Sequence, residues 1–176
     1  MEALVGLYAP LRLRVNVEKS AVARVWDRQF LGFSFWVASG SVVKRRVAPK
    51  ALRKMKERVR EMTSRTGGRS LVQVVRTLRS YLVGWRAYFR LAATPAVFVQ
   101  VDQWLHRRLR MRLLKQWKRG RTMYHELQRR GVQGAALGIA VRFGRSWWHV
   151  AAHKALQIAL PGKYFDSLGV PRLAQR

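Results

Sequence analysis

The middle of the chain carries three stretches in which apolar residues recur at helical spacing. From Pro49 onward the intervals are three and four, at Leu52, Met55, Val59 and Met62. A second stripe covers residues 71–89 behind a Ser70–Gln73 capping-box pattern, and a third covers residues 95–117. Apolar positions at this spacing lie on one face of an amphipathic helix. The sequence therefore predicts three helices that pack together through their apolar faces.

The flanking regions predict a little β-structure and several short helices. Residues 11–17 alternate between apolar and polar types, as in a half-buried strand, and residues 30–47 have the pattern of a β-hairpin. Beyond Gly120 we predict short helices near 122–130, 133–142 and 146–158, then an irregular end. The expected fold is mainly α, a helical bundle preceded by a small β-hairpin element. The expected domain boundary separates residues 1–48 from residues 49–176.

The composition adds a strong positive charge to this picture. The 176 residues include 36 Lys and Arg against 8 Asp and Glu, which gives a formal net charge of +28. With 7 Trp, 5 Tyr and 7 Phe, the chain is too aromatic for a disordered basic tail and should form a packed core. Because such a charge repels itself unless a polyanion neutralises it, nucleic acid is the expected partner. No apolar run is long enough to span a membrane, so no membrane partner is expected.

Two basic clusters contain most of the candidate contacts. Ten Lys and Arg lie between Lys44 and Arg65 against two acids, and ten lie between Arg107 and Arg130 against Glu126 alone. Phosphate contacts from such clusters release counterions and make binding steeply dependent on salt. The alternative is a solvated face that only keeps the protein soluble, although such faces usually mix both signs. The candidate RNA-binding residues are Lys44, Arg45, Arg46, Lys50, Arg53, Lys54, Arg79, Arg86, Arg107, Arg108, Arg110, Lys115, Lys118 and Arg121.

The acidic residues are too few and too scattered for a catalytic centre. Only Glu57 and Glu61 are close in sequence, and both lie in a basic helix where neighbouring Lys and Arg are expected to pair with them. His149 and His153 have the spacing of two metal ligands on one helix, but Val150 stands where zinc proteases have Glu. We therefore expect no catalytic residue, no metal ligand and no cofactor, and no enzymatic activity of the chain on its own.

The second helical stretch contains a tryptophan with two competing interpretations. Trp85 is in line with the aliphatic positions of its stripe, which favours a place in the core. The alternative is an exposed indole that stacks on an unpaired base. Gly84 is expected to let a neighbouring helix approach closely. Arg79 and Arg86 fall off the stripe and are expected to meet phosphate.

Several motifs occur in the order of one known protein family. They are Phe30-Leu31-Gly32-Phe33, the stretches 46–52 and 81–89, and then residues 104–118, 127–132 and 164–169. Together they resemble the carboxy-terminal part of bacterial group II intron reverse transcriptase/maturases, from about Leu11 onward. The first motif is similar to the last palm block and the second to the start of the thumb, the maturase-specific or X domain. The third resembles that domain's most characteristic stretch.

The resemblance implies a palm remnant over residues 1–48 and a helical thumb over residues 49–176. In this family the thumb grips the template–primer duplex and contacts intron RNA. Group II intron RNA or an RNA/DNA duplex is therefore the implied partner, in a bacterial cytoplasmic ribonucleoprotein. The family's Tyr-x-Asp-Asp box has no counterpart in this sequence, so the chain is expected to be a truncated or split copy without a polymerase site.

The sequence leaves four functions open. The first is an RNA-binding maturase-type domain that assists splicing of a group II intron. The second is the C-terminal subunit of a split RNA-directed DNA polymerase, with fingers and palm supplied by a separate polypeptide. The third is a basic structural RNA-binding protein unrelated to introns, and the fourth is a decayed copy.

Overall fold

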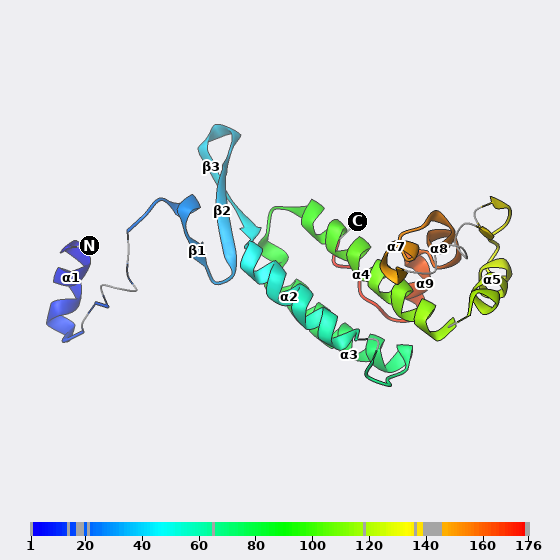
Figure 1. Cartoon of the computed structure of the whole chain (residues 1–176). Coiled ribbons are helices and arrows are strands. Elements are labelled where there is room, and N and C mark those ends of the chain that lie inside the picture. Colours follow the sequence, from blue (N-terminus) through cyan, green and yellow to red (C-terminus); the bar gives the residue numbers. More distant parts are fainter. Residues whose placement is uncertain are drawn as a thin grey trace.

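The chain extends from an N-terminal helix through a β-hairpin into a helical body. The computed structural model describes residues 2–13, 15–16, 20, 22–64, 66–117, 119–135, 137–138 and 146–174. Helix α1 (Glu2–Tyr8) stands at one end, three long helices form the middle, and short helices gather at the other end (Figure 1). This mainly helical architecture, with a small antiparallel sheet in front of the helices, confirms the predicted fold class.

Helices α2 (Pro49–Met62), α3 (Leu71–Tyr88) and α4 (Pro95–Trp117) form the centre of the molecule. Their predicted stripes are buried, at Met55, Val59, Met62, Val74, Val75, Leu78, Leu82, Phe98, Val101, Leu105 and Leu109. The predicted capping box begins α3: the Ser70 hydroxyl accepts from the Gln73 N–H at 3.3 Å, and the Gln73 side chain accepts from the Ser70 N–H at 2.9 Å. Two amide groups that lack helical partners are thereby satisfied.

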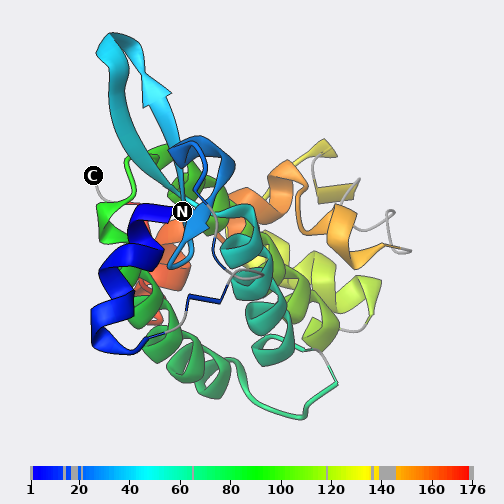
Figure 2. The same ribbon diagram turned by 90° about the vertical axis from the view of Figure 1, so that its left-hand side faces the viewer.

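A three-stranded antiparallel sheet precedes these helices, in the order β1 (Gln29–Phe30), β2 (Phe33–Ala38) and β3 (Val42–Val47). The connection η3 (Ser39–Ser41) contains Gly40 at a φ of 78°, which the tight turn requires and glycine adopts without strain. The β2–β3 hairpin projects from the helical body (Figure 2). Its base is attached to the α3–α4 connection, where the Ala93 N–H donates to the Arg45 carbonyl at 2.7 Å.

The predicted strand over residues 11–17 is wrong for the residues that the structure describes there. Leu11 ends the 3₁₀ turn η1 (Ala9–Leu11), and Arg12 has a left-handed φ of 55°. Leu13 and Asn16 belong to no strand, while positions 14 and 17 lie outside the described residues. Alternation alone was misleading because a strand needs a partner to bond with, and none of the described strands lies beside this segment.

Four short helices pack at the far end of α4: α5 (Gly120–Arg129), α7 (Trp147–Val150), α8 (Lys154–Ala159) and α9 (Gly162–Ser167). Helix α5 agrees with the prediction near 122–130. The helix predicted over 146–158 is interrupted, because residues 151–153 form a turn and the His153 ring accepts from the Ala155 N–H to cap α8. The prediction for 133–142 lies partly outside the described residues.

Trp85 lies in the core, as predicted. It is 9% exposed, and its ring packs at centroid distances of 4.8 Å from Phe89, in the turn η4 (Phe89–Leu91), and 5.9 Å from Phe98 of α4. The expectation for Gly84 is wrong, because a Cβ added there would meet no atom within 4 Å. Since successive helical residues point about 100° apart, the neighbour of a buried tryptophan can face open solvent.

Candidate nucleic-acid interface

Trp104 of α4 is surrounded by cations from two helices. The Lys56 Nζ and the Arg60 guanidinium carbon each lie 5.7 Å from the ring centroid, and the Arg108 guanidinium carbon lies 5.6 Å from it. Each cation gains about 0.5–1 kcal/mol from the ring at an exposed site. The three cations also repel one another, because like charges this close cost energy even near solvent. A bound anion would relieve this repulsion.

Helical spacing extends this group into a longer face. Arg53 is one turn before Lys56 on α2, and Lys115 is two turns after Arg108 on α4, so both lie along the same side of their helices. Lys115 and Arg53 are exposed. We call the set Arg53, Lys56, Arg60, Trp104, Arg108 and Lys115 the α2–α4 basic face.

The other polar side of α2 has a different character. Lys50, Lys54, Glu57 and Glu61 follow one another at intervals of four, three and four, so acids and bases share this side. Glu61 also accepts from Arg58 at 2.8 Å, in agreement with the expected pairing of this acid. Mixed charges are typical of a solvated surface. Lys50 and Lys54 are exposed, and among the described residues the cations over the Trp104 ring are Lys56, Arg60 and Arg108 rather than these two.

The hairpin carries a second exposed basic surface. The Lys44 ammonium lies 5.7 Å from the Trp36 ring centroid, and the Arg46 Nε donates to the Ser34 hydroxyl at 3.1 Å. Both pairs are direct cross-strand neighbours, so Lys44 and Arg46 share one face of the hairpin and Arg45 faces the other way. All three cations of β3 are exposed.

Arg107 and Arg110 of α4 hold the short C-terminal helices in place. The Nε of Arg107 donates to the Trp148 carbonyl, and the Nε of Arg110 donates to the Leu160 carbonyl at the end of α8, each at 2.9 Å. A carbonyl at a helix end has no partner within the helix, and a positive charge there is favourable. Arg110 is only 8% exposed. It therefore does not project from the outer basic surface as the charge pattern suggested.

Arg108 and Arg112 bind the end of α2 in the same way. The Arg108 Nε donates to the Thr63 hydroxyl at 2.9 Å, and the two terminal nitrogens of Arg112 donate to the carbonyls of Ser64 and Arg69. Thr63 is fully buried and Arg112 is 5% exposed. The basic run of α4 thus has two roles, because part of it fastens the connection between α2 and α3.

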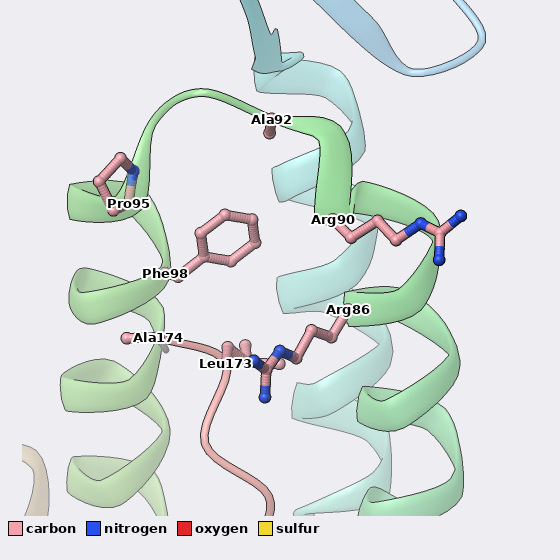
Figure 3. Close-up of a pocket in the computed structure, with 7 residues that line it drawn as sticks. All are labelled: Arg86, Arg90, Ala92, Pro95, Phe98, Leu173 and Ala174. Carbon is pink, nitrogen blue, oxygen red and sulfur yellow. The ribbon is translucent and has the colours of Figure 1, made fainter. Parts of the chain in front are cut away.

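Arg86 and Arg79 of α3 meet the C-terminal segment. The Arg86 Nη1 donates to the Arg172 carbonyl at 2.8 Å, and the Arg79 guanidinium lies against Gly169. Figure 3 shows the Arg86 side chain turned toward Leu173, beside a cavity of about 140 Å³ between α3 and the start of α4. Arg86 therefore makes a structural contact that its position off the apolar stripe did not predict.

The C-terminal segment is fastened by a buried carboxylate. Asp102 accepts hydrogen bonds from the Leu173 N–H at 3.0 and 3.1 Å and from the Ala174 N–H at 3.0 Å. Burial raises the pKa of Asp102, while these two amide donors act in the opposite direction. Leu173 is 2% exposed, so the segment completes the core between α3 and α4.

Two candidate residues, Lys118 and Arg121, lie at and beyond the end of α4 in the sequence. Arg121 is exposed on α5, and Lys118 lies outside the described residues. Sequence reasoning missed Lys56 and Arg60, whose role depends on Trp104 almost fifty residues away. The sequence did contain a signal for this role, because Lys56 and Arg60 are four residues apart on α2, as Trp104 and Arg108 are on α4.

The described residues contain no group of three or more His, Cys, Asp or Glu side chains that could hold a metal ion. The His149 ring is hydrogen-bonded to the Ser146 hydroxyl at 2.7 Å, and His153 caps α8, so each histidine has a local structural contact. In the part of the chain that the structure describes, every helix is too short or too polar to cross a membrane.

Comparison with known proteins gives one family. Residues 52–131 match the family model of the group II intron, maturase-specific domain. The matched segment begins within α2, includes α3, α4 and α5, and so contains every residue of the α2–α4 basic face. The chain matches none of the curated proteins.

Proposed function

We propose that the chain binds group II intron RNA and assists splicing, through the segment 52–131 that matches the maturase-specific domain. The observation that supports this most strongly is the set of three cations around Trp104. Contacts from such a face go to phosphates and recognise the shape of an RNA helix more than its sequence. The domain acts in this proposal as a binding module without a polymerase site of its own.

The binding surface is tested by paired charge removals on one helix. The variant Lys56→Gln/Arg60→Gln removes two cations from the α2–α4 basic face, and Lys50→Gln/Lys54→Gln removes two from the mixed side of the same helix. The first variant should weaken RNA binding and lower its salt dependence by about one unit of slope for each phosphate that is no longer neutralised. The control should weaken binding clearly less. Equal effects in both variants would refute a localised interface.

Specificity for an intron needs a separate measurement. Purified protein is titrated with folded group II intron RNA and with ribosomal RNA at about 0.2 M salt, where nonspecific phosphate binding is weakened. Preference for the intron, together with faster splicing when the protein is added, would support the maturase proposal. Equal affinity for both RNAs, without an effect on splicing, would favour a basic structural RNA-binding protein.

The N-terminal region favours a second candidate, the C-terminal subunit of a split RNA-directed DNA polymerase. Ten of the twenty exposed large hydrophobic side chains among the described residues lie between Val5 and Leu31. Exposed apolar side chains in such number are typical of a surface that another protein covers. In this candidate the segment binds a separate fingers–palm polypeptide. Adding such a polypeptide should restore primer extension, and deleting residues 2–28 should prevent it while leaving RNA binding by the helical body unchanged.

A further inference from the structure

A polar cavity lies between α4 and the region of α7 and α8. Its volume is about 350 Å³, at the small end of the range for ligand sites. Most of its side chains come from consecutive turns of α4, and the others come from the region of α7 and α8. The lining residues are Gln103, His106, Arg107, Arg110, Ala152 and Gln157.

Both arginines of this cavity are held in fixed positions. The Nε of Arg107 is bound to the Trp148 carbonyl, and its guanidinium lies 4.0 Å from the centroid of the Trp148 ring. Arg110 is fixed through its Nε to the Leu160 carbonyl. In both residues the Nε donates to a carbonyl, and the terminal nitrogens remain as donors on a rigid planar group. Such preorganised guanidinium groups bind tetrahedral oxyanions with little loss of entropy.

The protein supplies these two cations with no carboxylate. Among the described residues neither Arg107 nor Arg110 takes part in a salt bridge. Burial lowers the pKa of both guanidinium groups. For Arg110, which is 8% exposed, burying a charge without a counter-charge is costly, whereas Arg107 is half-buried. Of the two acids that act on His106, Asp102 accepts from backbone amides, and Asp166 accepts from Arg172 through Oδ2 while its buried Oδ1 has no hydrogen-bond partner.

His106 completes the wall between the arginines. Its ring stacks on Phe165 at a centroid distance of 5.4 Å, and Gly162 leaves room for it, since a Cβ there would lie 3.2 Å from the ring. Burial lowers the pKa of His106, and Arg110 and Arg172 lower it further, while Asp102 and Asp166 raise it. An anion in the cavity would act on this pKa in the same direction as the two acids.

From these contacts we propose that the cavity binds a phosphate group between Arg107 and Arg110, with the amide of Gln103 as a further donor; the Gln157 Nε2 already donates to the Ala152 carbonyl at 2.7 Å. This site is separate from the α2–α4 basic face, because Arg107 and Arg110 are bound to the carbonyls of Trp148 and Leu160, whereas the Trp104 ring is approached by cations of α2. The proposal does not depend on RNA binding by that face. The phosphate can belong to an RNA strand or to a small phosphorylated molecule, because the chemistry of recognition is the same.

The first test uses inorganic phosphate and the four histidines of the chain. The His106 titration is followed by NMR in phosphate and in chloride at equal ionic strength. Phosphate should raise the midpoint of the His106 titration and the Tm. Equal behaviour of His106 in the two salts would overturn the proposal.

A charge placed in the cavity gives the matched variant. Gln103→Glu puts a carboxylate on its lining, and Gln100→Glu adds the same charge one turn earlier on α4, at an exposed position outside the lining. Gln103→Glu should raise the His106 midpoint without phosphate and weaken phosphate binding by about tenfold, because the two anions compete for the same arginines. Gln100→Glu should do neither. Unchanged phosphate affinity in Gln103→Glu would contradict the assigned site.

A competition experiment between inorganic phosphate and RNA distinguishes the two sources of the phosphate group. A short oligoribonucleotide is added to the phosphate-loaded protein, and the His106 signal is followed in wild type and in Lys56→Gln/Arg60→Gln. If the ligand is an RNA phosphate, the oligonucleotide displaces inorganic phosphate and keeps the His106 midpoint raised. If it is a small molecule, phosphate and oligonucleotide bind together and their affinities are independent. Either outcome supports an anion site, whereas release of phosphate with a return of the midpoint to its chloride value would refute it.

Discussion

Truncating Trp85 to alanine should unfold a large fraction of the protein under conditions where the wild type is stable. The indole is 9% exposed and contacts Phe89 and Phe98, so the change leaves a hole at the junction of α3, η4 and α4. Removal of about 200 Å² of buried aromatic surface at ~25 cal/mol per Å² amounts to about 5 kcal/mol as an upper value. Replacing a buried large aromatic by alanine typically costs about 3–5 kcal/mol.

The assay is urea and thermal denaturation, with Tyr124→Ala as the control. Tyr124 is an exposed aromatic on α5, and its removal should cost about 0.5 kcal/mol or less. For a chain of this size the expected destabilisation in Trp85→Ala lowers Tm by about 6–20 °C. RNA affinity of the folded fraction should be unchanged. A Trp85→Ala protein with wild-type stability but without RNA binding would refute the core assignment and make the indole a stacking surface.

Three further predictions follow from the described contacts. Gly84→Ala should raise the unfolding free energy by about 0.5–1 kcal/mol, because the added Cβ meets no atom and alanine favours the helix; a lower Tm would contradict this. Stability should fall as pH drops below about 6.5, because the folded His106 has a lowered pKa and the unfolded state binds the proton first. Urea titrations at pH values above and below this value should show the fall in stability in the wild type and not in His106→Gln. Primer extension by the purified chain alone should give no product, because the sequence has no Asp-Asp pair to bind catalytic metal ions, and template-dependent product would disprove this.

The helices could be predicted from the sequence because their signals are local. The stripes of α2, α3 and α4 and the capping box at Ser70 depend on residues three or four positions apart, and the structure confirms them. The strand predicted over 11–17 failed because alternation does not reveal whether a partner strand exists. Gly84 was misinterpreted because the same residue type serves close packing in one helix and an open surface in another.

The candidate site was predictable only in part, because arginine has two uses that look alike in sequence. Arg108 approaches Trp104, whereas Arg110, two residues later, is buried against a carbonyl fifty positions away. Helical spacing alone does not divide α2 into a basic and a mixed side, because Lys50 and Glu57 each lie within about one turn of Arg53. Contacts such as Arg86 with the C-terminal segment depend on tertiary structure, and no local pattern indicates them.

The attachment of the C-terminal segment to Asp102 has a consequence for the time order of synthesis. The segment that matches the maturase-specific family model ends at residue 131, but Asp102 in its longest helix receives its amide partners from Leu173 and Ala174. At about 5–20 residues per second, the ribosome needs roughly 2–8 s to add the intervening residues. During that interval α3 and α4 lack the residue that covers their junction, and a buried carboxylate lacks its donors. Nascent chains should therefore remain protease-sensitive in this region until Leu173 has left the ribosomal tunnel.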